Sequence, residues 1–113
     1  MRGFPLAVLQ APQDKAGLSQ DDVYSSIIPR RTLSHRVKNH QRLSLDESNR
    51  VSRISRIFAL AAETLGGDER AREWPHRPLR QFGNRRPFDM LATDLGDHQV
   101  ETLLGRIAHG VTA

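Results

Sequence analysis

Residues 44–67 read SLDESNRVSRISRIFALAAETLGG, and this stretch decides the fold. Ser44 followed three residues later by Glu47 is the capping-box pattern that begins an α-helix. Asp46 adds negative charge in the first turn, where the helix dipole is positive. The glycine pair at 66–67 can take the left-handed conformation that closes a helix, and no proline interrupts the residues between. The stretch therefore predicts one long helix.

Apolar residues recur along this helix at steps of three and four, which places them on one stripe. The stripe consists of Val51, Ile54, Phe58, Ala61 and Leu65, with Ile57 and Ala62 beside it. Serine, arginine and glutamate residues occupy the opposite side. Because the helix is amphipathic, we expect the rest of the chain to pack against one of its faces.

The composition favours a small helical protein. The chain has 113 residues, enough for one domain with a modest core, and only 37% of them are hydrophobic, with four Phe, one Trp and one Tyr. No run of alternating Val, Ile, Thr or Tyr residues between turn clusters indicates a strand. We therefore predict an all-α fold with a small interior and a partner surface.

Positive charge exceeds negative charge in this chain. There are 17 Lys and Arg against 13 Asp and Glu, a formal charge of +4, and lysine occurs only at Lys15 and Lys38. Because the arginine fork suits phosphates and carboxylates, this charge favours a polyanion or an acidic protein as partner over a neutral ligand. A basic surface that serves only solubility is the alternative.

The remaining composition bears on compartment and cofactor. Without cysteine the chain has no disulfide framework and no thiolate metal site. The longest apolar run, residues 57–62, is too short to span a bilayer, and no apolar signal-peptide core follows the first five residues. We expect a soluble, cytoplasmic protein with no cofactor and no membrane partner.

The first third of the chain predicts short helices. In residues 1–19, Pro12 and then Gly17 are expected to break any helix that begins near Phe4. Ser19 is a predicted N-cap, followed by acidic residues in the first turn of a helix about two turns long.

A basic helix is predicted next. Pro29 fits its first position, where the missing N–H is no loss. Residues 29–42 carry five Arg or Lys and two His, with Leu33 and Val37 as a thin apolar seam. Two short helices joined by a tight turn, the second strongly basic, are the arrangement of a helix-turn-helix that enters a DNA major groove. A solvated basic helix without a DNA partner is the alternative.

Three shorter helices are predicted after the long one. The first runs from Asp68 to Pro75, with Trp74 as a core or interface anchor. After a loop, Pro87 begins the second. The third covers residues 97–109. Its apolar stripe and its stop are Val100, Leu103, Leu104, Ile107, Ala108 and Gly110.

No catalytic pattern emerges from the sequence. The five histidines show no H-x-x-x-H spacing around a glutamate, so we expect surface histidines and no metal site, with a site assembled only in three dimensions as the alternative. There is no G-x-S-x-G motif, and the glycines at 66–67 end a helix rather than open one around a phosphate. We therefore expect the chain not to be an enzyme.

An ordered series of motifs from residue 17 to residue 113 resembles the Xre/MbcA/ParS-type antitoxins of bacterial toxin–antitoxin pairs. The motifs are GLSQDDVY (17–24), IIPRRTLSHR (27–36), LSLDESNRVSRISRI (43–57), Trp74, RPFDMLATDLG (86–96) and VETLLGRIAHGV (100–111). Together they cover about the last five-sixths of the chain.

This resemblance implies a small all-α protein with a helix-turn-helix region and a C-terminal helical domain that binds and blocks a RES-domain toxin. Such toxins destroy NAD, and such antitoxins commonly dimerise and repress their own operon. We place the helix-turn-helix region at 1–43, with a first helix shortened by Pro12, and the toxin-binding domain at 44–113. The C-terminal residues that match the family are Pro87, Asp89, Leu91, Gly96, Val100, Leu104, Ile107 and Gly110.

The resemblance also implies two sites. For DNA, we expect residues 29–38 of each copy of a homodimer to enter successive major grooves of the operator. The DNA-binding residues are Arg30, Arg31, Thr32, His35, Arg36 and Lys38, with Arg36 and Lys38 on phosphates. For the toxin, we expect the end of the last helix and its anionic tail to cover the active site and exclude NAD. The residues of this site are Arg106, His109, Gly110, Val111, Thr112 and Ala113.

Other readings of the residues stay open at this point. One alternative is a stand-alone helix-turn-helix regulator without a toxin partner. Another is a protein-binding module whose arginines contact an acidic protein surface instead of DNA. For the tail, the alternative is that residues 111–113 are frayed and have no inhibitory role.

Overall fold

The computed structural model describes residues 3–110, which form two compact units that divide inside one long helix. The N-terminal unit extends to Ser52, and the C-terminal unit begins at Arg53. No strand occurs within residues 3–110, where Leu79 and Arg85 form an isolated antiparallel bridge. The predicted all-α fold is confirmed. The predicted boundary between the helix-turn-helix region and the toxin-binding domain, at 43/44, stays a prediction. The first compact unit also includes about two turns of the long helix, up to Ser52.

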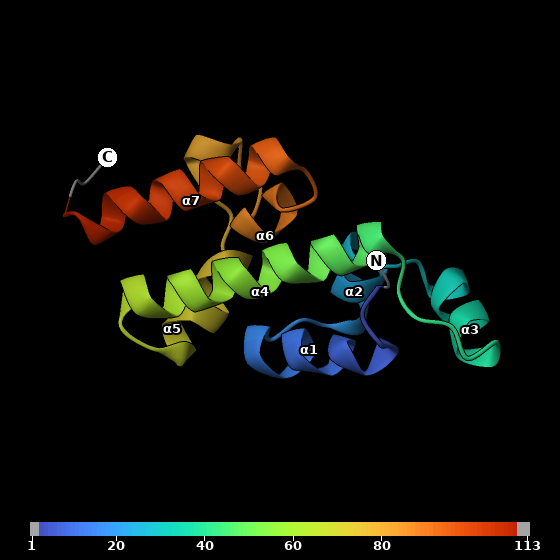
Figure 1. Ribbon diagram of the computed structural model, residues 1–113. Helices are drawn as coiled ribbons and strands as arrows, with labels where there is room; N and C mark the ends of the chain where they lie inside the picture. The colour runs from blue at the N-terminus through green and yellow to red at the C-terminus, as the bar shows by residue number, and fades with distance from the viewer. Residues whose placement is uncertain (1–2, 111–113) are drawn as a thin grey trace. The chain divides into compact units, whose positions relative to one another are not determined.

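The N-terminal unit contains four short helical segments and the beginning of the long helix (Figure 1). They are the 3-10 helix η1 (Leu6–Leu9), then α1 (Gln10–Ala16), α2 (Gln20–Ser26) and α3 (Arg30–Lys38), followed by the start of α4 (Leu45–Leu65). Its buried apolar side chains are Leu9, Ala16, Leu18, Val23, Ile27, Ile28, Leu43 and Val51.

Pro12 does not break a helix, so that prediction was wrong. Pro12 is the third residue of α1, in the first turn, where a backbone N–H has no partner within the helix. The 3-10 helix η1 runs directly into α1, so the helical backbone begins at Leu6, near Phe4, and continues past Pro12. Gly17 ends α1 as predicted, in the left-handed conformation with φ of 62°.

The two helices that follow agree with the sequence in most respects. Ser19 caps α2 as predicted, and the structure adds a capping box in which the Asp22 carboxylate accepts a hydrogen bond from the Ser19 amide. Pro29 stands one position earlier than predicted, as the residue before α3, because its ψ of 147° is extended. Leu33 is half-buried, but Val37 is 56% exposed, so the predicted apolar seam on α3 is wrong at Val37.

The long helix α4 begins as its sequence predicts. The Ser44 Oγ accepts a hydrogen bond from the Glu47 amide at 3.1 Å, and the Glu47 Oε1 accepts one from the Ser44 amide at 2.7 Å. The predicted stripe is buried at Val51, Ile54 and Ala61. Ile57, predicted beside the stripe, is also buried, whereas Phe58 and Leu65 are half-buried.

The C-terminal unit contains the rest of α4 and five further helical segments (Figure 1). They are α5 (Asp68–Glu73), η2 (Trp74–His76), η3 (Arg80–Phe82), α6 (Pro87–Met90) and α7 (Asp94–Ala108). Its buried apolar side chains are Ile54, Ile57, Ala61, Ala71, Phe88, Met90, Leu91, Val100, Leu103 and Leu104. Pro87 begins α6 as predicted, and Trp74 is half-buried.

The last helix begins earlier than predicted and ends within one residue of its predicted end, but its last turn is less buried than expected. α7 begins at Asp94 and not at Asp97, because the Thr93 Oγ1 caps it by accepting a hydrogen bond from the Gly96 amide at 3.0 Å. The apolar stripe is buried only through Leu104. Ile107 is 38% exposed, and Ala108 after it is also exposed, so the last turn of α7 contributes no buried side chain.

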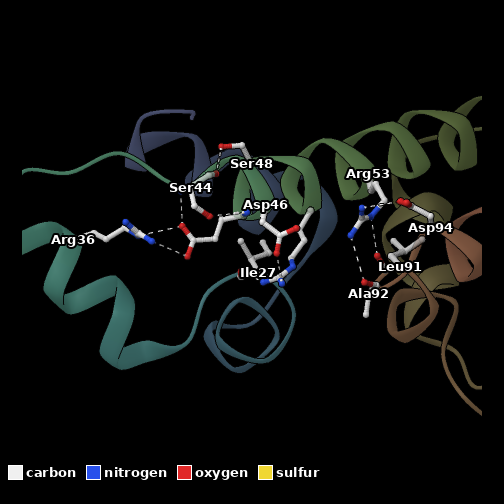
Figure 2. Close-up of polar contacts among 11 residues, drawn as sticks. Ile27, Arg36, Ser44, Asp46, Ser48, Arg53, Leu91, Ala92 and Asp94 are labelled. Carbon is white, nitrogen blue, oxygen red and sulfur yellow. Dashed lines mark hydrogen bonds and ion pairs between the residues drawn. The ribbon is translucent and has the colours of Figure 1, made fainter. Parts of the chain in front are cut away.

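One arginine of α4 organises the connection between α6 and α7. The Arg53 Nε donates a hydrogen bond to the Leu91 carbonyl at 3.1 Å, and Nη2 donates to the Ala92 carbonyl at 3.4 Å (Figure 2). Its Nη1 forms an ion pair with Asp94 at 3.1 Å. These carbonyls end α6, so Arg53 holds the α6 terminus and the α7 start together.

Candidate functional sites

The exposed face of α3 concentrates positive charge. Arg30, Arg31, His35 and Lys38 are exposed, and their spacing of one, four and three residues places them on one side of a helix. Residues 29–45 contain no Asp or Glu to offset this charge. The structure thus brings four of the six predicted DNA-binding residues onto one accessible surface.

Thr32 and Arg36 lie elsewhere on α3. Both are half-buried, and the Arg36 side chain points toward the first turn of α4 (Figure 2). There the Arg36 Nε lies 3.1 Å from the Glu47 Oε1, and Nη2 donates to Oε2 at 3.3 Å. Side-chain exposure is 22% for Arg36 and 9% for Glu47, so the ion pair is largely sheltered. A phosphate contact by Arg36 stays a prediction, and it would have to share this guanidinium with Glu47.

Glu47 has two structural tasks. It completes the capping box of α4 and it neutralises Arg36, so one carboxylate joins α3 to the start of α4. Its neighbour Ser48 accepts a hydrogen bond from the Phe4 amide at 2.9 Å and donates to the Ser44 carbonyl at 2.8 Å. The N-terminal segment, α3 and the start of α4 are therefore connected by hydrogen bonds, which sets the direction in which α3 presents its basic face.

The predicted toxin-binding residues are only partly described by the structure. Arg106 and His109 are exposed at the end of α7, and Gly110 takes a φ of 70° after the helix, as expected of a stop. Val111, Thr112 and Ala113 lie outside the described residues. Arg106 is in the same helix as the buried Leu103 and Leu104, which fix where its side chain begins.

An open cleft of about 690 Å³ lies in the C-terminal unit, between the turn that follows Leu79 and α7. Its floor is apolar, and its rim carries cations. The apolar residues are Phe82, Met90 and Leu103; the basic ones are Arg85, His98 and Arg106; the neutral polar ones are Gln81, Gln99 and Thr102. No Asp or Glu lines it.

Sequence reasoning did not find this cleft, apart from Arg106. The wall opposite α7 is an irregular turn, closed by backbone hydrogen bonds from the Leu79 amide to the Arg85 carbonyl at 3.1 Å and from the Asn84 amide to the Leu79 carbonyl at 2.9 Å. Gly83 and Asn84 both have positive φ within this turn. The glycine and asparagine were a signal for a turn, but no pattern indicated that it faces α7.

Three arginines of the C-terminal unit form ion pairs with nearby carboxylates. The Arg86 Nη2 donates to the Asp89 carboxylate at 2.8 Å, and this hydrogen bond lowers the pKa of Asp89 below its usual 3.8. Arg56 pairs with both Asp97 and Glu101. Across residues 3–110, no three His, Asp or Glu side chains gather in a way that could hold a metal ion. None of the helices in that range has the length and apolar character that a membrane span needs.

Comparison with known families accounts for both units. Residues 1–56 match the model of the antitoxin Xre-like helix-turn-helix domain. Residues 60–110 match the model of the antitoxin Xre/MbcA/ParS C-terminal toxin-binding domain. The two matches are in the order that the sequence resemblance implied.

Three curated relatives are each named "Antitoxin Xre". An "Antitoxin Xre" of Pseudomonas putida is 40% identical over 84 residues, which are 74% of this chain and 53% of the relative. The chain thus spans about half the length of that relative. An "Antitoxin Xre" of Yersinia enterocolitica is 32% identical over 96% of this chain and 75% of the relative. One of Photorhabdus laumondii is 31% identical over 98% of this chain and 76% of the relative.

A solved structure has the same fold. The crystal structure of the M. tuberculosis MbcT–MbcA toxin–antitoxin complex contains a chain that matches with a TM-score of 0.65 and 23% identity, covering 95% of this chain and 96% of that one. Relatives that are named antitoxins agree with the expectation that this chain is not an enzyme. On these matches, the chain belongs to the Xre/MbcA/ParS family of antitoxins.

Proposed function

We propose that this chain binds and neutralises a RES-domain toxin through its C-terminal unit. The observation that carries the proposal is the match of residues 60–110 to a toxin-binding domain. It is supported by the similar fold in the M. tuberculosis toxin–antitoxin complex. Because NAD and operator DNA are cytoplasmic in bacteria, the proposed place of action is the cytoplasm.

The end of α7 is the proposed contact with the toxin's active site. Its last turn exposes Ile107 beside Arg106 and His109, so an apolar side chain and two basic ones are accessible together. An apolar residue in a basic setting is typical of a protein contact surface. In the proposed mechanism this turn, with Gly110 and the tail at 111–113, covers the mouth of the toxin's NAD pocket and excludes the dinucleotide.

Co-expression with the RES-domain protein of the same operon tests this function. The expected result is a stable complex on pull-down and a preserved cellular NAD level, against NAD loss when the toxin is expressed alone. A variant that ends at Gly110 separates binding from coverage. If it keeps the complex but lets NAD fall, the tail covers the active site. Unchanged inhibition by this variant would reject the role of residues 111–113.

A second proposed function is binding of operator DNA by a homodimer through α3. The supporting observation is the exposed face of Arg30, Arg31, His35 and Lys38, together with the match of residues 1–56 to a helix-turn-helix domain. Each phosphate contact should add about 0.9 to the slope of log affinity against log salt concentration. Lys38 is the exposed predicted phosphate contact, and each copy of the homodimer presents it once, so the variant K38A should lower this slope by about 1.8.

The control for this experiment is Lys15→Ala, which removes one cation from α1 and leaves α3 unchanged. Its salt slope should equal that of the wild type. Operator binding that is indifferent to salt would reject the DNA function, and a monomer in light scattering would reject the homodimer. Salt-dependent operator binding without any toxin complex would instead favour a stand-alone regulator.

A further inference from the structure

We infer that the cleft between the Leu79–Arg85 turn and α7 is a second contact surface for the toxin, which seats a toxin segment bearing a carboxylate next to an apolar side chain. The inference rests on the proposed function, because the occupant is the toxin. It adds a binding surface separate from the tail that covers the active site.

Acidic and basic side chains of α7 lie on different sides of the helix. Asp94, Asp97 and Glu101 all pair with arginines of α4, namely Arg53 and Arg56. The residues that line the cleft, His98, Thr102 and Arg106, follow a spacing of four and occupy the adjacent side of the same helix. The acidic groups of α7 are therefore engaged away from the cleft, and its side of the helix is basic.

The cations at the cleft have no acidic partner within residues 3–110. The Arg85 Nε donates to the Phe82 carbonyl at 3.3 Å, which anchors this side chain at the rim and leaves the two terminal amino groups for another acceptor. Arg106 has no ion pair in the same range. Two guanidinium groups on opposite walls of one cleft favour a carboxylate, which each can bind in a fork-to-fork geometry.

The floor of the cleft favours an apolar group beside that carboxylate. Met90 and Leu103 are buried beneath it, and Phe82 on the turn is half-buried. A nucleic-acid backbone would leave this apolar floor unused, whereas a peptide segment satisfies both the floor and the rim. The volume of about 690 Å³ accommodates a few side chains. Arg106 also belongs to the proposed toxin contact at the end of α7, so the two surfaces adjoin.

The test is the affinity of the full chain for its RES-domain toxin, measured by calorimetry at low and high salt. Arg85→Glu reverses a rim charge, and Thr102→Trp fills the mouth of the cleft; both residues are exposed. Each should raise Kd about tenfold or more. The control, Arg77→Glu, makes the same charge change on an exposed residue outside the cleft and should stay within about threefold.

The outcomes separate this inference from the proposed function. Wild-type binding that is weakened by both cleft variants and not by Arg77→Glu supports the cleft. Wild-type binding that both cleft variants retain in full overturns the cleft and leaves the antitoxin function standing. Absence of wild-type binding rejects the proposed function and the cleft with it. The midpoint of thermal unfolding of each variant is measured as well. We expect it to equal that of the wild type, which shows that a variant with weaker binding is still folded.

Discussion

Gly96 lies where the first turn of α7 meets the end of α6, and an added methyl group has no room there. A Cβ at Gly96 would lie 1.8 Å from the carbonyl oxygen of Met90 and 2.8 Å from its carbonyl carbon. The obstacle is backbone and cannot swing aside as a flexible side chain does. Gly105, in the same helix, provides the comparison, since nothing lies within 4 Å of the position that a Cβ would take there.

The expected magnitude follows from two opposing terms. Alanine in place of a helical glycine contributes about 0.5–1 kcal/mol of stability, because it restricts the unfolded chain. At Gly105 this gain stands alone. At Gly96 the two backbones must separate by about 1.5 Å to reach van der Waals distance, which disturbs the packing of buried Met90 and costs about 1–3 kcal/mol or more. We expect a net loss of about 1–2 kcal/mol for Gly96→Ala.

Urea unfolding followed by circular dichroism measures both variants. Gly96→Ala should lower the free energy of unfolding, and Gly105→Ala should raise it by about 0.5–1 kcal/mol. If Gly96→Ala is as stable as Gly105→Ala, the close approach of α6 and α7 is refuted, together with the placement of the cleft that α7 lines.

Three further predictions concern ion pairs. Glu47→Ala removes both a partner in the capping box of α4 and the ion-pair partner of half-buried Arg36, so it should lower the free energy of unfolding in urea by about 2 kcal/mol. The control Asp46→Ala, at an exposed ion pair, should lower it by about 0.5 kcal/mol. Equal losses would contradict the double role of Glu47. Arg53→Lys should lower the free energy of unfolding by about 1 kcal/mol, because a lysine ammonium lacks the guanidinium fork that reaches three acceptors. A midpoint of thermal unfolding equal to that of the wild type would contradict this role of Arg53. Because Arg86 lowers the pKa of Asp89, the Asp89 carboxylate contributes stability above its ordinary pKa of 3.8, and this is lost as pH falls through the folded pKa. Asp89→Asn should therefore be less stable at neutral pH by under about 1 kcal/mol, since the pair is partly exposed, and this difference from the wild type should shrink as pH falls below 3.8. A difference that stays unchanged in acid would argue against the pair.

Local signals in the sequence were enough to place most helices. The capping box at Ser44, the N-cap at Ser19, the proline that begins α6 and the glycine that ends α1 all act within three or four residues. Their hydrogen bonds depend on neighbours in the chain and not on packing, so the sequence alone predicts them. The ordered family motifs were equally visible, and the comparisons confirm the family that they indicated.

Burial along a helix was less predictable. Pro12 was expected to break a helix, but its effect depends on where the helix begins, which the sequence did not show. Val37 and Ile107 continue apolar stripes by spacing and yet are exposed. Periodicity indicates which residues share a face, but it does not say how far a neighbouring element extends to cover that face.

Tertiary structure alone decided the contacts between distant segments. The pairing of Arg36 with Glu47, the reach of Arg53 to the Leu91 carbonyl and the approach of Gly96 to α6 are set by the path of the backbone between them. The sequence by itself determined an all-α antitoxin with a basic helix early in the chain and an amphipathic helix at its end. The basic cleft beside α7 arises only when a turn is folded against that helix, because a cleft needs two walls and no local pattern describes the second one.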